Sequence, residues 1–158
     1  MALAWQTIDL VRVPSYPAGL WTLAQEFVPG SRLLRLRTVN QDNEGAPVAT
    51  IWSPADGVFC GPDGDLTATD RKAILCGSAA CGALVGKIGG STGDLPDSPG
   101  GASGPYAGKK VFAVGTECIV SLPTAADGGP LFLTMNDSPE YFPRHAGDLF
   151  VLLQYYPL

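Results

Sequence analysis

Histidine, basic residues and long apolar runs are all scarce in this sequence, and each shortage excludes a class of function. The chain has one histidine, His145, and four cysteines. Four residues separate Cys76 from Cys81, a wider spacing than the Cys-x2-Cys of common zinc sites. We therefore expect no structural zinc. Cys60, Cys76, Cys81 and Cys118 are predicted to be reduced, largely buried thiols.

Basic residues are outnumbered by acidic ones. Ten Lys and Arg stand against fifteen Asp and Glu, giving a net charge of −5 and a pI near 4.6. Nucleic-acid binding depends on a basic face that neutralises phosphates, so no nucleic-acid partner is expected. The small cluster of Arg32, Arg35 and Arg37 favours the outward face of a strand, with a phosphate or sulfated-glycan site as the alternative.

No apolar run approaches the roughly 20 residues that a membrane-spanning helix needs. The first thirteen residues also lack the basic start and long apolar core of a secretory signal. We expect a soluble protein without a membrane span, cytoplasmic as synthesised, whose export would use a route without a cleaved signal.

Glycine and proline are frequent, with 20 and 14 copies in 158 residues. Such frequent breaks leave little room for long helices, whereas short runs rich in β-branched and aromatic residues recur between them. The pattern predicts one all-β domain over residues 1–158, a sandwich with a Gly/Pro-rich insertion loop at about 89–108. The expected strands are 5–13, 20–27, 32–39, 48–52, 83–88, 109–114, 117–122, 130–136 and 149–156.

The last two expected strands enclose an irregular segment, residues 137–148, that is rich in Asp, Pro, Glu, Arg and His. A polar loop at one end of a sheet is where binding sites usually lie. The final strand is nearly continuously apolar, which suggests burial on both faces, one in the core and one in a subunit contact.

Three blocks of sequence carry a resemblance to a known family. They are Gly61-Pro62-Asp63-Gly64-Asp65, the segment from Cys76-Gly77 through Cys81-Gly82-Ala83-Leu84-Val85 to Lys87-Ile88-Gly89, and Asn136-Asp137-Ser138-Pro139 with Ala146-Gly147. In this order they are similar to bacterial calcium-dependent galactose-binding lectins of the galactophilic PA-I type. The resemblance covers about two thirds of the chain and implies a jelly-roll-type β-sandwich, galactose-binding-domain-like, that forms a homo-oligomer. It also places Cys81 near the ligand end, where an accessible thiol is an open alternative.

The resemblance further implies a loop that binds calcium, which in turn binds sugar hydroxyls. Asp137 keeps the family's acidic ligand and Tyr141 falls at a carbonyl ligand, with Asp56 near another, so these three would bind calcium if it is retained. Arg144 and His145 replace the two expected Asn ligands, although calcium needs about six to eight oxygens and Arg offers none. We therefore expect a rebuilt site, in which Arg144 takes the place of the cation beside Asp137.

The predicted ligand-binding residues are Asp137, Arg144, His145, Trp52, Asp70 and Arg71. Trp52 is either a core residue or a platform that stacks on a sugar ring. His145 near carboxylates is compatible with a general base, but no nucleophile motif accompanies it, so we expect no enzyme. The sequence predicts a non-catalytic, lectin-like protein that binds a glycan or glycoconjugate. The alternative is a structural or assembly subunit that kept the fold and lost sugar binding.

Overall fold

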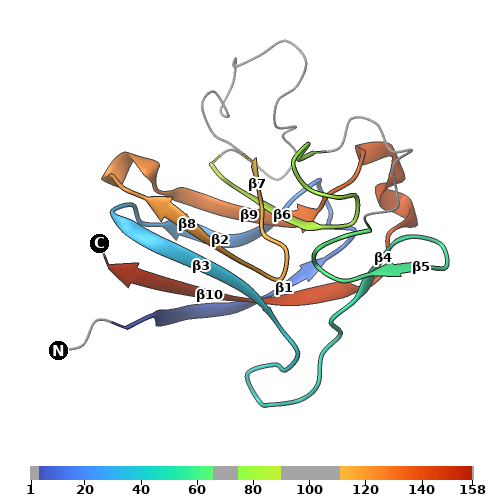
Figure 1. Ribbon diagram of the computed structural model, residues 1–158, viewed down its shortest axis with the longest axis horizontal. Helices are drawn as coiled ribbons and strands as arrows, with labels where there is room; N and C mark the ends of the chain where they lie inside the picture. The colour runs from blue at the N-terminus through green and yellow to red at the C-terminus, as the bar shows by residue number, and fades with distance from the viewer. Residues whose placement is uncertain (1–3, 66–74, 90–110, 158) are drawn as a thin grey trace, which may run out of the picture.

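Two four-stranded antiparallel sheets make up most of the computed structural model, which describes residues 4–65, 75–89 and 111–157 (Figure 1). The first sheet has the order β1 (Gln6–Pro14), β10 (Asp148–Pro157), β3 (Arg32–Val39) and β8 (Glu117–Leu122). The second has the order β2 (Thr22–Val28), β9 (Gly129–Met135), β6 (Leu84–Ile88) and β7 (Val111–Ala113). A hairpin of β4 (Trp52–Ala55) and β5 (Val58–Cys60) and two short 3₁₀ helices, η1 (Ala125–Asp127) and η2 (Pro139–Arg144), complete the described elements.

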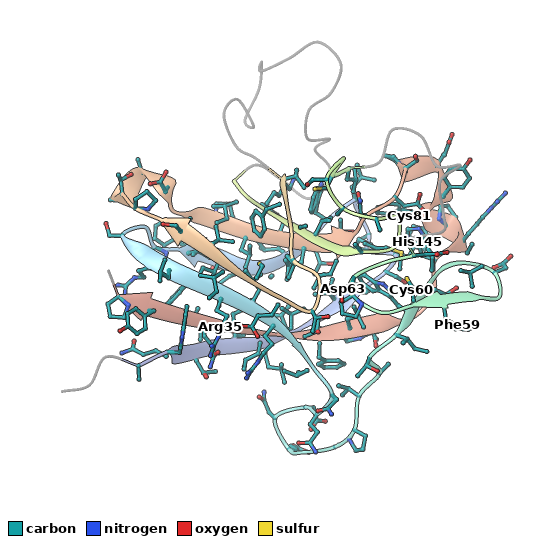
Figure 2. The ribbon with its side chains drawn as sticks, viewed as in Figure 1. Arg35, Phe59, Cys60, Asp63, Cys81 and His145 are labelled. Atoms are coloured by element: carbon teal, nitrogen blue, oxygen red, sulfur yellow. The ribbon has the colours of Figure 1, made fainter. Side chains whose placement is uncertain are left out.

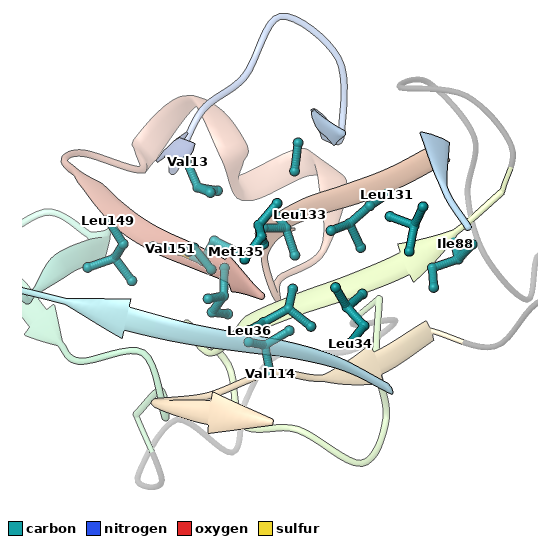
Figure 3. Packing of buried hydrophobic residues seen from close by; sticks show 14 of the residues in the cluster. Val13, Leu34, Leu36, Ile88, Val114, Leu131, Leu133, Met135, Leu149 and Val151 are labelled. Atoms are coloured by element: carbon teal, nitrogen blue, oxygen red, sulfur yellow. The ribbon is translucent and has the colours of Figure 1, made fainter. Parts of the chain in front are cut away.

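The core lies between the two sheets. Successive side chains of a strand point to opposite faces of its sheet, so alternate residues of each strand face this core. In β3, Leu34 and Leu36 are fully buried, while Arg35 and Arg37 between and after them are partly exposed. The same alternation supplies Leu149, Val151 and Leu153 from β10 and Leu131, Leu133 and Met135 from β9 (Figure 3). The sandwich is thus held by apolar side chains from both sheets.

Part of the outer face of the second sheet is also buried. A second cluster there contains Trp21, Val85, Phe132 and Phe142. Lys87 in β6 is fully buried, and its ammonium group lies 4.5 Å from the centre of the Trp21 ring and 4.8 Å from that of Phe132. The two ring faces stabilise this cation where water does not reach it.

The prediction of an all-β domain is confirmed, and most strands lie within two residues of their expected bounds. The expected strand at 48–52 is wrong, since β4 begins at Trp52 and continues through Ser53 and Pro54. β10 buries one face in the core and half-buries Phe150 and Leu152 on the other, and the subunit contact expected on that face stays a prediction. The expectation for Arg32 needs correction. Arg32 does not share an outward face with Arg35, because its guanidinium lies 5.6 Å above the ring of Tyr155, which packs against the core.

Two further expectations concern the Gly/Pro-rich loop and the absence of a membrane-spanning helix. Apart from Gly89, the predicted Gly/Pro-rich loop lies outside the described residues. Within the described part of the chain, none of the helices has the length and apolar character needed to cross a membrane.

Candidate functional site

The Asn136-Asp137 corner joins β9 to the turn at residues 76–82. The Asn136 side chain is fully buried, and its Oδ1 accepts a hydrogen bond from the Cys76 backbone N at 2.8 Å. Its Nδ2 donates to the carbonyls of Cys76, Ala79 and Ala80 at 2.9 to 3.1 Å. One amide thus satisfies four backbone groups of a turn, which explains Asn at this position as a structural clamp.

Asp137 and His145 form a buried pair across η2. Both side chains have zero exposure, and His145 Nε2 lies 2.9 Å from Asp137 Oδ2. Pro139 begins the 3₁₀ helix and His145 ends it, so the helix sets the separation of the two side chains. Figure 2 shows His145 at the end of the sandwich that carries the β4–β5 hairpin.

The other ring nitrogen fixes the hydrogen-bonding pattern of this pair. His145 Nδ1 lies 2.8 Å from the carbonyl oxygen of Ser15, which can only accept, so Nδ1 carries a hydrogen. Nε2 and the Asp137 carboxyl therefore share a single further hydrogen. With the hydrogen on either partner the pair has a net charge of zero, which is the condition for burying it.

The carboxylate expected to bind calcium, that of Asp137, is already engaged by protein groups. Asp137 Oδ2 already contacts the His145 ring, and Oδ1 accepts from the Ser138 backbone N at 2.8 Å. Asp56 is exposed in the β4–β5 turn. No group of three or more His, Cys, Asp or Glu side chains in residues 4–65, 75–89 and 111–157 is placed to hold a metal ion. A ring nitrogen in place of an oxygen ligand opposes calcium at Asp137.

The other predicted ligand residues are dispersed. Arg144 is exposed, with its guanidinium 5.6 Å above the half-buried ring of Tyr141, so His145 and not Arg144 is the partner of Asp137. Trp52 is 1% exposed and donates from Nε1 to the Gly82 carbonyl at 2.7 Å, so it is a core residue whose ring faces are covered. Asp70 and Arg71 lie outside the described residues.

An open groove lies elsewhere, beside the turns that follow β3 and precede β8. We call it the Thr50 groove; its volume is about 540 Å³, and its polar lining comes from three separated segments. It is lined by Arg37, Thr38, Asn40, Thr50 and Thr116, with Val39 and Pro62 as apolar contacts. No local sequence pattern marks this groove, because residues 37–40, 50 and 116 come together only in the folded chain.

Asp63 is bound by Thr116, which lines the groove, and follows Pro62, which also lines it. Its Oδ1 accepts from the Thr116 backbone N at 2.9 Å, and its Oδ2 accepts from the Thr116 hydroxyl at 2.8 Å. Gly115 allows this approach: its φ is +61°, and a Cβ there would lie 2.4 Å from Asp63 Oδ1. Figure 2 shows Asp63 well separated from His145. The groove and the buried pair are therefore different regions.

A smaller hollow adjoins the Asp63–Thr116 contact, because Asp63, Gly115 and Glu117 line it. This Cys118 hollow has a volume of about 390 Å³ and is lined by Asp63, Ser78, Gly115, Glu117 and Cys118, with Ala79, Ala80, Ala83, Ala113 and Val114 as apolar contacts. Its thiol is a poor nucleophile, because burial raises the pKa of Cys118 to about 12.

The four cysteines are thiols, as the sequence predicts. Cys60, Cys76 and Cys81 are 4 to 8% exposed, so Cys81 is not the accessible thiol that the family resemblance allowed. Burial, with a smaller contribution from the Asp65 carboxylate, raises the pKa of Cys60 to about 11. Cys60 is therefore a packing residue and not a nucleophile near neutral pH.

No protein-family model and no curated protein sequence matches this chain. What the site can do therefore rests on its geometry. The Thr50 groove offers hydroxyl, amide and guanidinium groups to a polar ligand.

Proposed function

We propose that this protein is a non-catalytic carbohydrate-binding protein whose glycan lies in the Thr50 groove. One observation carries the proposal: an open groove lined by three threonine hydroxyls, the Asn40 amide and the Arg37 guanidinium. Sugar hydroxyls need paired donors and acceptors. The Thr50 hydroxyl and the Asn40 amide supply both, whereas the hydroxyls of Thr38 and Thr116 already donate to the Thr116 carbonyl and to Asp63, so they accept from a sugar. Val39 and Pro62 add apolar contacts for the C–H face of a sugar ring.

The resemblance to galactose-binding lectins supports the scaffold and not the original ligand loop. A jelly-roll topology and a bacterial, lectin-like homo-oligomer belong to this proposal. The Asp137–His145 pair is already satisfied and buried, so we assign the 137–148 loop a structural role. Binding in the groove needs no metal, because its polar lining contains a single charged side chain, that of a cation, Arg37.

A glycan panel tests the proposal, with each probe measured in calcium and again in chelator. We expect binding that chelation leaves unchanged and that the double variant Asn40→Ala/Thr50→Ala weakens at least about tenfold, equivalent to 1.4 kcal/mol. Ser121→Ala is the matched control, because Ser121 is an exposed hydroxyl on β8 that does not line the groove. Binding that the double variant retains in full would rule out this site.

The alternative, a structural or assembly subunit, is favoured by a different observation. Ile51 and Phe59, next to and within the β4–β5 hairpin, are 52% and 67% exposed. The same hairpin contacts the 137–148 loop through reciprocal backbone hydrogen bonds between Ser53 and Ala146 at 2.8 and 3.0 Å. A rigid loop beside exposed apolar side chains suits contact with a second copy of the chain.

Sedimentation velocity across a concentration series tests this alternative. If the hairpin is the contact, Phe59→Ser shifts the protein towards the monomer, whereas Phe27→Ser on β2, 63% exposed in the wild type, does not. An oligomer that both variants leave intact would exclude the hairpin as the contact.

A further inference from the structure

We propose that the sugar site extends over both hollows, so that its ligand is a neutral oligosaccharide of at least two residues. This inference rests on the proposed function and specifies its substrate class. The two hollows share the same two turns. Pro62 and Thr116 line the Thr50 groove, whereas their sequence neighbours Asp63, Gly115 and Glu117 line the Cys118 hollow.

The size of the two hollows supports a ligand longer than one sugar. Volumes of about 540 and 390 Å³ each fall in the range of roughly 300–1,000 Å³ typical of small-molecule sites. A single pyranose in either hollow leaves the other empty. A chain of two or more residues that crosses the Asp63–Thr116 contact would make polar contacts on both sides of it.

The contact between the hollows is suited to this role because it is already fixed. Both Asp63 oxygens accept hydrogen bonds from Thr116, which leaves each with a further lone pair for a sugar hydroxyl. The missing Cβ of Gly115 leaves room for the Asp63 carboxylate in this arrangement. Groups fixed before binding lose little conformational entropy when the ligand arrives.

The lining of the Cys118 hollow selects the charge of the ligand. Asp63 and Glu117 place two carboxyl groups around it, while Ala80 and Ala113 provide apolar contacts. Carboxylates accept from sugar hydroxyls but repel uronic acids and sulfated sugars. We therefore assign neutral oligosaccharides to the site, in spite of Arg37 in the neighbouring groove.

Titration calorimetry with homologous series tests the inference. The probes are galactose, glucose and N-acetylglucosamine, each beside its β1,4-linked disaccharide and hexasaccharide. We expect at least one series in which the hexasaccharide binds at least about tenfold tighter than its monosaccharide. Ala113→Trp, at an exposed position that lines the Cys118 hollow, should remove this gain.

Two further variants keep the test decisive. Ser121→Trp carries the same ring on an exposed β8 position outside both hollows and should retain the gain. Glu117→Ala removes a hollow side chain without adding bulk and should reduce the gain if Ala113→Trp fails to fold. Equal affinities across every series, or a gain that both hollow variants retain, would overturn the two-hollow site alone. No binding by any probe would overturn both this inference and the proposed function.

Discussion

Two anchored aspartates distinguish the two polar regions of this molecule. Asp137 and Asp63 each accept a backbone hydrogen bond on Oδ1 and contact a side chain through Oδ2. Asp137 is fully buried and its partner is an ionisable ring, whereas Asp63 is exposed and its partner is a hydroxyl. The first arrangement closes a loop onto the sandwich. The second holds a carboxylate at the surface, beside open space.

This contrast shows what makes a polar cluster a candidate binding site. The 137–148 loop contains the more suggestive residues, yet its acid and its histidine satisfy each other. The Thr50 groove contains ordinary threonines and an asparagine, but it leaves them facing a hollow. Residue type indicates possible chemistry, and exposure decides whether a ligand can use it.

The largest expected effect comes from breaking the buried pair. Asp137→Ala leaves His145 without its carboxyl partner, and removing one member of a buried pair costs about 3–5 kcal/mol. Asp63→Ala also removes an anchored carboxylate, but at the surface, where we expect a loss of about 1 kcal/mol or less. At roughly 2–4 °C per kcal/mol for a chain of this size, thermal unfolding separates the two variants. Equal losses would contradict the contrast.

A double-mutant cycle sharpens this prediction. Asp137→Ala/His145→Ala removes both partners, so its loss of unfolding free energy should be smaller than the sum of the single losses, with a coupling of about 0.5–3 kcal/mol. Strict additivity would show that the two side chains do not stabilise each other.

The sequence predicts features that depend on residues close together in the chain. It does not predict contacts between residues that are far apart in the chain. Alternation is local, so β3 was predicted with its observed bounds and Leu34 and Leu36 identify its core face. The His145 partner at Ser15 is 130 residues away, and the groove combines Asn40 with Thr116. Neither can be deduced from spacing. Trp52 illustrates a third limit, because its type suits both a core and a sugar platform, and only its burial decides.

A smaller loss of stability is expected at the turn that supports the exposed aspartate. Gly115→Ala places a Cβ 2.4 Å from Asp63 Oδ1 at a φ of +61°, so either the backbone or the carboxylate must shift. Backbone strain of this kind costs about 1–3 kcal/mol. Gly45→Ala is the control, because its φ of +81° is similar but an added Cβ meets no atom within 4 Å. The difference between their melting temperatures measures the steric part, and equal temperatures would mean that the Asp63 contact yields freely.

The thiols of Cys60 and Cys118 should make the free energy of unfolding depend on pH. The pKa of Cys60 is raised to about 11 and that of Cys118 to about 12, mainly by burial, from 9.0. The folded state thus holds these protons where the unfolded state releases them, so stability is retained below pH 9 and falls as pH rises towards 11 or 12. The slope is at most about 1.4 kcal/mol per pH unit for each thiol. Urea unfolding of Cys60→Ser and Cys118→Ser should each give a flatter profile, and an unchanged profile in both would assign the slope to other groups.

Of all these changes, calcium should have the smallest effect on the melting temperature, because Asp137 is already in contact with His145. An ion that binds only the folded state at one hundred times its Kd would stabilise it by about 2.7 kcal/mol, a shift that a melting curve resolves. Because the His145 ring contacts the carboxyl oxygen that a cation would need, we expect no shift in the wild type with calcium or with chelator. His145→Asn removes that ring and supplies an amide oxygen, so a calcium-dependent rise in the melting temperature of this variant alone would show that the histidine excludes the ion. A rise in the wild type would instead mean that the pair opens to admit it, and would return the ligand site to the loop.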